Sequence, residues 1–462
     1  MNIDNLTRLV KSPHLVVIKH GLGHIVYHSL FGCPTVINTS GFRVLNLFRK
    51  PHCLVDIKKR YEIQGLNHWL QAFVGQRFLI REGTNERATL ERAVDKAIKR
   101  IAQGKQLTSL GLILDESCNF NCSYCVSRKL IQVSKRSSPK IKRMSWAIAQ
   151  HAIDTFVTLA RKQGRQKLEV YLGGSEPLLN WRVFQCAIEY CKSKYGNEFK
   201  FRFSTNTNAS LINADRAAFL AHHQVTITSS LDGPKSANDM IRKLRSGKGT
   251  FTRIVSGWDH LGVKGRNVKW FCLTLTDQNI ESINEEFFDF LASRRIVSCS
   301  FEPDLICSLA HTPKQVVAAL LCFKKWGESR KISVGGLWCK PFKNLFSTNR
   351  RPNFFNCSAF TGRGISVLPS GEIVPCSYSA TKLGTIDDLE TIFQAKQFQA
   401  FTATRAVGNI EACRGCEIEG QCMGGCYLTT EYGSHTGSQN AFTYRCEIYK
   451  RATRSLLLAS VQ

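Results

Sequence analysis

Three cysteines stand close together on one short segment, at Cys118, Cys122 and Cys125. Three residues separate the first pair and two separate the second, directly after an apolar run over 110–114. Three thiolates on one loop can hold three irons of a [4Fe–4S] cluster and leave the fourth iron open, whereas a structural cluster normally has four cysteine ligands. Because an open iron can bind and activate a small molecule, this spacing predicts redox chemistry at the loop.

A second group of cysteines occupies the C-terminal part of the chain. Its members are Cys357, Cys376, Cys413, Cys416, Cys422, Cys426 and Cys446. Pairs separated by two residues suit zinc as well as iron–sulfur clusters, so the residues alone leave both metals open. The chain has 19 cysteines, and their clustering favours metal ligands over disulfide bonds.

Composition narrows the class of protein. The 462 residues allow several domains, and 43% hydrophobic content is typical of a globular chain. No apolar run reaches the ~20 residues of a membrane span, and the N-terminus has no apolar signal core, so we expect a cytoplasmic protein without membrane contact. The net charge of +28 suggests an acidic partner. The basic residues are spread along the chain, which disfavours nucleic acid.

Strand-like and helix-like segments alternate six times through the middle of the chain. The strand-like segments are 110–114, 168–172, 199–204, 225–230, 268–276 and 296–301, and the helix-like segments lie near 145–161, 179–194, 213–223, 250–261, 284–294 and 313–328. This alternation predicts an α/β fold, a partial (β/α)6 TIM-like barrel over 106–327. The cysteine loop follows the first strand, where such barrels place functional loops.

Two further domains flank the predicted barrel. Residues 1–105 contain a hairpin at 15–27, a third strand at 35–37, three short helices and a strand at 78–80, followed by a charged helical connector. This order predicts a winged-helix-like α+β domain. Residues 328–462 form a bridging region and a cysteine-rich domain.

The motifs over 107–327 resemble the radical S-adenosylmethionine (SAM) superfamily. The cysteine loop with the aromatic Tyr124 is similar to that family's CxxxCxxC motif, and Gly174 and Glu176 stand in a Gly-Gly-x-Glu-Pro-like sequence. Ser230 and Arg242 resemble the serine and arginine of peptide-modifying members. The resemblance implies that SAM binds the open iron and these five residues, and that one electron cleaves it to a 5′-deoxyadenosyl radical. That radical would remove a hydrogen atom from the substrate.

One position departs from the family motif. Ser175 stands where the family usually has glycine, which puts the exact backbone fit around the ligand in doubt.

The seven C-terminal cysteines resemble the SPASM domain, which implies two auxiliary [4Fe–4S] clusters and three clusters in all. In that family the ligation is interleaved. The nearer cluster would take Cys357, Cys376 and Cys426, and the outer cluster Cys413, Cys416, Cys422 and Cys446. The nearer cluster then lacks a fourth ligand, for which Cys339 is the candidate ahead of Cys307 and Cys322.

The N-terminal domain resembles the peptide-recognition domain fused to maturases of ribosomally made peptides. In that domain a leader peptide adds a strand to a sheet edge. The resemblance implies a precursor peptide as substrate and a reductant such as flavodoxin or ferredoxin. We expect hydrogen abstraction from Cα or Cβ and a thioether or carbon–carbon cross-link. The sequence assigns no general acid or base.

Two alternatives remain open at this point. Anaerobic sulfatase maturases carry an aspartate after the cysteine equivalent to Cys376, where this chain has Ser377, a poor base. Formylglycine formation is therefore the second hypothesis. The third is a non-enzymatic iron–sulfur or zinc regulator that binds DNA through the N-terminal domain.

Overall fold

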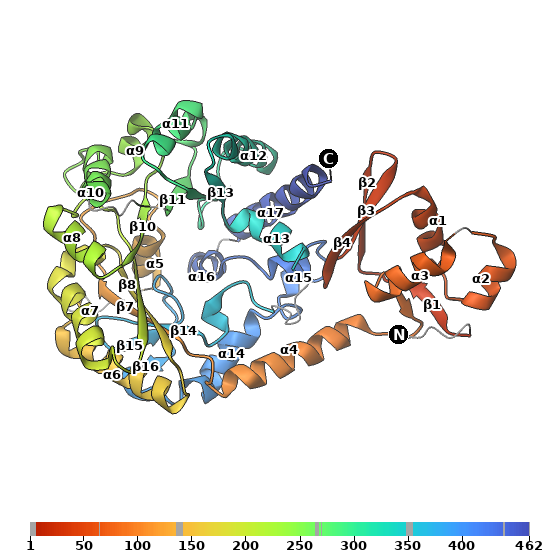
Figure 1. Ribbon diagram of the computed structural model, residues 1–462, viewed down its shortest axis with the longest axis horizontal. Coiled ribbons are helices and arrows are strands. Elements are labelled where there is room, and N and C mark those ends of the chain that lie inside the picture. The colour runs from red at the N-terminus through yellow and green to blue at the C-terminus, as the bar shows by residue number, and fades with distance from the viewer. Residues whose placement is uncertain are drawn as a thin grey trace.

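The computed structural model describes residues 6–63, 65–134, 142–263, 268, 270–347, 354–437 and 439–461. Figure 1 shows an N-terminal domain at the right, a curved sheet wrapped in helices at the left, and C-terminal helices between them. Within the described ranges, no helix combines the length and the apolar character needed to cross a lipid bilayer.

The N-terminal domain contains two three-stranded sheets and three helices. Its strands are β1 (Arg8–Lys11), β2 (Leu15–His20), β3 (Gly23–His28), β4 (Gly32–Ile37), β5 (His52–Cys53) and β6 (Leu79–Arg81), and its helices are α1 (Thr39–Leu47), α2 (Leu54–Arg60) and α3 (Leu66–Gly75). One sheet has the antiparallel order β2-β3-β4 and the other has β5-β1-β6. The Asn38 side chain caps α1 by accepting from the Gly41 N–H at 2.9 Å.

Two strands of this domain, β1 and β5, were not predicted from the sequence. The last strand, β6, pairs with β1, which is too short and polar to be recognised from its sequence. In the β2-β3-β4 sheet the edge strands are β2 and β4, since β3 lies between them.

Helix α4 (Glu86–Ala102) connects the N-terminal domain to the barrel. It runs along the lower side of the molecule in Figure 1, from the N-terminal domain to the sheet. Its apolar side chains recur at helical spacing and are buried: Leu90, Val94, Ala97 and Ile101. At its start Arg87 donates to both carboxylate oxygens of the buried Glu419, at 3.0 and 2.8 Å.

The central sheet has ten strands in the order β13-β12-β11-β10-β9-β8-β7-β14-β15-β16. The six barrel strands are β7 (Ser109–Asp115), β8 (Lys167–Gly174), β9 (Lys200–Asn206), β10 (Thr226–Ser230), β11 (Trp270–Leu275) and β12 (Ser298–Pro303). They pair in parallel, and their middle residues are buried between the helices outside and the side chains within.

The outside of this sheet is covered by helices (Figure 1). They are α6 (Trp146–Lys162), α7 (Trp181–Tyr195), α8 (Ala214–His222), α9 (Lys235–Ile241), α10 (Phe251–Val263), α11 (Glu285–Ser293) and α12 (Pro313–Ser329). Helix α5 (Val126–Ser134) directly follows the cysteine loop and contacts the C-terminal region instead. Ser145, Asn213, Asn284 and Thr312 cap α6, α8, α11 and α12. The predicted α/β fold with a partial barrel of parallel strands is confirmed, whereas α5 and α9 were not predicted.

The C-terminal region extends the same sheet and then folds into helices. Its elements are β13 (Ser333–Gly335), α13 (Lys340–Leu345), β14 (Gly364–Val367), β15 (Glu372–Val374), β16 (Gly384–Thr385), α14 (Lys396–Thr404), α15 (Glu419–Cys422), α16 (Tyr427–Thr436) and α17 (Asn440–Ala459). Strand β14 pairs in parallel with β7, so the sheet is continuous across both cysteine regions. The N-terminal domain packs on α13 and α17 through Ile18, Ile25 and Tyr27.

Candidate active site and cluster sites

The loop after β7 faces a cavity of about 480 Å³ that Cys118, Cys122 and Cys125 line together. Charged side chains share this lining, among them Arg128 and Arg245. Burial raises the pKa of Cys118 to about 12 and that of Cys122 to about 11, so both thiols are protonated near neutral pH until a metal displaces the proton. The structure therefore places the three predicted ligands around one space.

Hydrogen bonds to neighbouring segments hold the loop in shape. The buried Asp115 carboxylate accepts from the Ser117 N–H at 2.8 Å and from Arg143 Nε at 2.9 Å. Arg245 Nε donates to the Cys118 carbonyl at 3.0 Å, and the Asn121 N–H donates to the carbonyl of Lys243. The loop is thus fastened both to the end of β7 and to the segment after α9.

Gly174 and Glu176 lie at the end of β8, beside the loop. Gly174 has φ +134°, and a Cβ there would stand 2.3 Å from the Asp115 carbonyl oxygen, so only glycine fits. Glu176 is fully buried and accepts from Thr207 Oγ1 at 2.7 Å and from the Asn208 N–H at 2.8 Å. Burial raises the pKa of Glu176, and these bonds oppose the shift. A carboxylate has room for one further donor.

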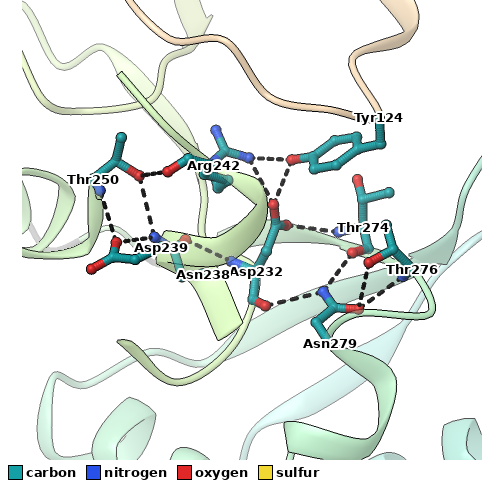
Figure 2. Close-up of polar contacts among 9 residues, drawn as sticks. All are labelled: Tyr124, Asp232, Asn238, Asp239, Arg242, Thr250, Thr274, Thr276 and Asn279. Atoms are coloured by element: carbon teal, nitrogen blue, oxygen red, sulfur yellow. Dashed lines mark hydrogen bonds and ion pairs between the residues drawn. The ribbon is translucent and has the colours of Figure 1, made fainter. Parts of the chain in front are cut away.

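Tyr124 and Arg242 meet at a buried carboxylate, Asp232, which follows β10 (Figure 2). Tyr124 Oη donates to Asp232 Oδ2 at 2.5 Å, and Arg242 Nη1 lies 3.3 Å from the same oxygen. The Thr274 N–H donates to Asp232 Oδ1 at 2.9 Å, and Asn279 Nδ2 donates to the Asp232 carbonyl at 3.0 Å. Asp232 therefore joins the cysteine loop to β10 and β11.

Asp239 and Thr250 hold the segment that carries Arg242 in place (Figure 2). Asp239 Oδ1 accepts from the N–H groups of Thr250 and Phe251, each at 2.7 Å. Thr250 Oγ1 donates to the Arg242 carbonyl at 2.7 Å. Ser230, the remaining predicted SAM contact, ends β10 opposite Cys272 of β11.

Asp232 lies two residues after Ser230, yet the sequence assigned it no role. A motif indicates which residues follow a strand, but the contacts of Asp232 come from three other elements. Asn279, Lys340 and Arg405 were missed for the same reason, since each acts through distant parts of the chain.

The seven C-terminal cysteines fall into two groups of interacting thiols. Cys357 and Cys426 lie close enough to Cys376 to add to the effect of burial, which raises its pKa to about 12. Cys413 and Cys416 likewise add to the effect of burial at Cys446, whose pKa is raised to about 12. Burial also raises the pKa of Cys422, with Cys446, Cys413 and Cys416 as neighbours. This grouping agrees with the predicted interleaving, although ligation itself is not shown.

Cys339, the candidate fourth ligand, has different surroundings. It is buried at the start of α13, and its Sγ donates to the Gly336 carbonyl at 3.1 Å. Burial raises its pKa, and the charged groups that act on it include Lys343 and Glu302. Its role as a ligand stays a prediction.

No three His, Cys, Asp or Glu side chains in the described ranges converge with the geometry of a single bound metal ion. A cluster of four irons separates its ligands more widely, because each thiolate binds a different iron. The surroundings of the cysteines nevertheless suit anionic clusters. Within the described ranges, buried nitrogens without a hydrogen-bond partner include Nε of Arg128, Arg242 and Arg405. Each lies near a cysteine group, where an anionic ligand would compensate its charge.

Comparison with known proteins agrees with the domain content. The radical SAM superfamily model matches residues 112–290, and the SPASM iron–sulfur cluster-binding domain model matches residues 357–417. The first range contains every predicted SAM contact, whereas Cys422, Cys426 and Cys446 lie beyond the second.

Two curated relatives share much of the chain. The radical SAM cyclopropyl synthase TigE of Paramaledivibacter caminithermalis is 23% identical over 98% of this chain and 96% of its own length. The cysteine-type anaerobic sulfatase-maturating enzyme of Clostridium novyi is 22% identical over 75% of this chain and 94% of its own.

Solved structures share the fold. Streptococcus suis SuiB bound to its precursor peptide SuiA has a TM-score of 0.51 at 15% identity, over 95% of this chain and 98% of SuiB. The structure of anSMEcpe with bound AdoMet has a TM-score of 0.61 at 16% identity, over 77% of this chain and 99% of its own. The domain matches remove the hypothesis of a non-enzymatic regulator. The chain is therefore a radical SAM enzyme with a SPASM iron–sulfur domain in its C-terminal part.

Proposed function

We propose that this enzyme modifies a ribosomally made peptide, with net loss of two hydrogens and formation of a carbon–carbon or thioether bond. The observation that carries the proposal is the alignment with TigE, which runs over 98% of the chain and so includes the N-terminal domain. That relative is a cyclopropyl synthase, which favours the carbon–carbon bond.

The chain's own residues define where the chemistry would take place. Cys118, Cys122 and Cys125 would hold the cluster that binds SAM, with Tyr124, Gly174, Glu176, Ser230 and Arg242 around it. When bound, these groups supply an organic radical that removes one hydrogen atom, and two auxiliary clusters supply electron transfer. The N–H groups that donate to the Glu176 carboxylate and the contacts of Asp232 keep the polar side chains oriented before SAM arrives.

The N-terminal domain would bind the leader of the peptide. A cavity of about 780 Å³ lies between α3, β1 and β6, with an apolar lining that includes Leu9, Val74 and Leu79. Arg77 and Arg81 add positive charge to the same lining. An acidic leader with alternating apolar residues would suit this surface and an open strand edge.

Attachment of this domain to the C-terminal region supports a shared task. The Gly420 N–H donates to the Ser29 carbonyl at 2.9 Å, and a Cβ on Gly420 would stand 2.0 Å from the Leu30 carbonyl oxygen. The main chains of the two regions therefore approach each other closely. A leader bound to the N-terminal domain would be held near the barrel.

Mass spectrometry tests the proposal. The probe is a peptide from any short reading frame found beside the gene, incubated anaerobically with SAM and a reductant such as flavodoxin. We expect the peptide to lose two hydrogens and to give one 5′-deoxyadenosine for each modification. A product that has unchanged mass in ordinary water and gains one deuterium at Cα in heavy water would indicate epimerisation and contradict the proposal.

A binding measurement tests the leader surface separately. Arg81→Glu should weaken peptide binding by about tenfold, because a like charge then faces the acidic leader. Arg43→Glu, an exposed change on α1 of the same domain, is the matched control. Equal affinities for the two variants would remove this surface from the proposal.

A further inference from the structure

Two positively charged side chains lie between the two groups of C-terminal cysteines. They are Lys340, at the start of α13, and Arg405, directly after α14. Arg405 is 6% exposed and Lys340 is half-buried. Within the described ranges, neither side chain has a carboxylate within 4.0 Å. Arg87, by contrast, forms an ion pair with Glu419.

Hydrogen bonds place both cations beside the cluster ligands. Lys340 Nζ donates to the carbonyl of Asn356, the residue before Cys357, and lies 3.2 Å from Asn356 Oδ1. Asn356 Nδ2 in turn donates to the Cys422 carbonyl at 2.7 Å. Lys340 is therefore tied to one cysteine of each group.

Arg405, from a later part of the chain, contacts the same region. Its Nη2 donates to the carbonyls of Gly424 and Gly425 at 2.8 and 3.2 Å, between Cys422 and Cys426. Its Nε is buried without a hydrogen-bond partner. A buried guanidinium with neither a carboxylate nor full hydrogen bonding is costly unless another anion lies close.

An iron–sulfur cluster held by thiolates is such an anion, and reduction adds one more negative charge to it. A nearby cation in a region of low dielectric constant stabilises the reduced form more than the oxidised form. We propose that Lys340 and Arg405 are inter-cluster cations that raise the reduction potentials of both auxiliary clusters. The proposal rests on the proposed function, because it requires the two auxiliary clusters.

This role fits an enzyme whose peptide product is oxidised. After loss of one hydrogen atom, bond formation in the substrate requires removal of one further electron and one proton. A higher auxiliary potential favours acceptance of that electron. Lys340 and Arg405 are positioning residues in this sense, since they act through the clusters and not on the substrate.

A redox titration monitored by electron paramagnetic resonance tests the proposal. The full chain with Cys118, Cys122 and Cys125 replaced by alanine is reconstituted anaerobically, so that only auxiliary clusters give signals. Lys340→Gln and Arg405→Gln should each shift the reduction equilibrium toward the oxidised form by about tenfold, which is 59 mV for one electron. Lys396→Gln removes an exposed charge at the start of α14, nine residues before Arg405, and should leave the potentials unchanged.

Charge-retaining variants keep the test decisive if a glutamine variant fails to incorporate iron. Lys340→Arg and Arg405→Lys should then load both clusters, which would show that the charge is required. Equal loss of iron in the charge-retaining variants would overturn the proposal, as would glutamine variants with the parent's potentials. If the parent itself holds fewer than two auxiliary clusters, the proposed function fails instead, and iron content distinguishes the two outcomes.

Discussion

At the loop of Cys118, Cys122 and Cys125, the buried guanidinium of Arg242 has the Asp232 carboxylate as its partner, 3.3 Å away. Among the C-terminal cysteines, Lys340 has no carboxylate partner in the described ranges, and neither has Arg405. In the first region this buried guanidinium is paired before any ligand binds, which suits a site that must exchange SAM at every turnover. In the second, Lys340 and Arg405 are left without a carboxylate partner among the described residues, which suits clusters that stay bound.

The largest effects should separate the two cysteine regions. Alanine at Cys118, Cys122 and Cys125 should abolish 5′-deoxyadenosine formation and lower the iron content from about twelve to about eight per chain, because only the loop cluster is lost. Alanine at Cys413 and Cys416 should leave reductive cleavage of SAM intact and block peptide modification. Chromatography of 5′-deoxyadenosine with parallel iron analysis measures both results. Undiminished 5′-deoxyadenosine in the triple variant would contradict the assignment.

Removing the charge partner at the loop should cost stability. Asp232→Asn leaves Arg242 buried without its carboxylate, and breaking such a pair costs about 3–5 kcal/mol in the free energy of unfolding. Chemical denaturation measures it. Asp259→Asn is the control, since Asp259 pairs with Arg294 at the exposed surface, where an ion pair contributes about 0–1 kcal/mol. Equal costs would show that Asp232 does not carry the buried network.

A methyl group at Gly174 should disturb the SAM site with a smaller effect on the fold. Gly174→Ala brings a Cβ to 2.3 Å from the Asp115 carbonyl oxygen and adds about 1–3 kcal/mol of backbone strain at φ +134°. Gly164→Ala shares a positive φ, +64°, but its Cβ meets nothing within 4 Å. Calorimetric titration with SAM should show weaker binding for Gly174→Ala alone. Unchanged affinity would mean that the close approach is not needed.

The smallest effect concerns attachment of the N-terminal domain. Glu86 is buried, and although desolvation raises its pKa, hydrogen bonds with His28 Nε2 at 2.9 Å and Ser12 Oγ at 2.5 Å lower it overall from 4.5. A lowered pKa in the folded state adds stability above about pH 4.5, which is lost as the pH falls through the folded value. Limited proteolysis near α4 should therefore accelerate below that pH. Glu86→Gln should remove this pH dependence, and a profile identical to the parent's would contradict the assignment.

The sequence predicted the barrel well because its signals are local. Apolar runs such as 110–114 and 168–172 become strands at those positions, and Ser145 and Asn213 cap helices where the pattern changes. Helices α5 and α9 were missed because each is short and follows a functional loop, whose residues are chosen for ligand contact rather than for helical periodicity.

The sequence predicted the candidate ligands of the site, but the residues that hold these ligands in place were missed. Cysteine spacing identified the loop, and a Gly-Gly-x-Glu-Pro-like sequence identified Glu176. Asp232 and Arg405 gave no such signal, because a buried carboxylate or guanidinium is recognised only once its partners from other elements are known. Long-range contacts of this kind have no fixed spacing in the chain.

The most direct test of a division between the two regions is the electron paramagnetic resonance spectrum of the reduced enzyme with and without SAM. We expect SAM to change the signal of one cluster and to leave the auxiliary signals as they are. The change should disappear when Cys118, Cys122 and Cys125 are replaced by alanine. A SAM-dependent change that persists in that variant, or one that disappears in the Cys413 and Cys416 variant instead, would contradict the account.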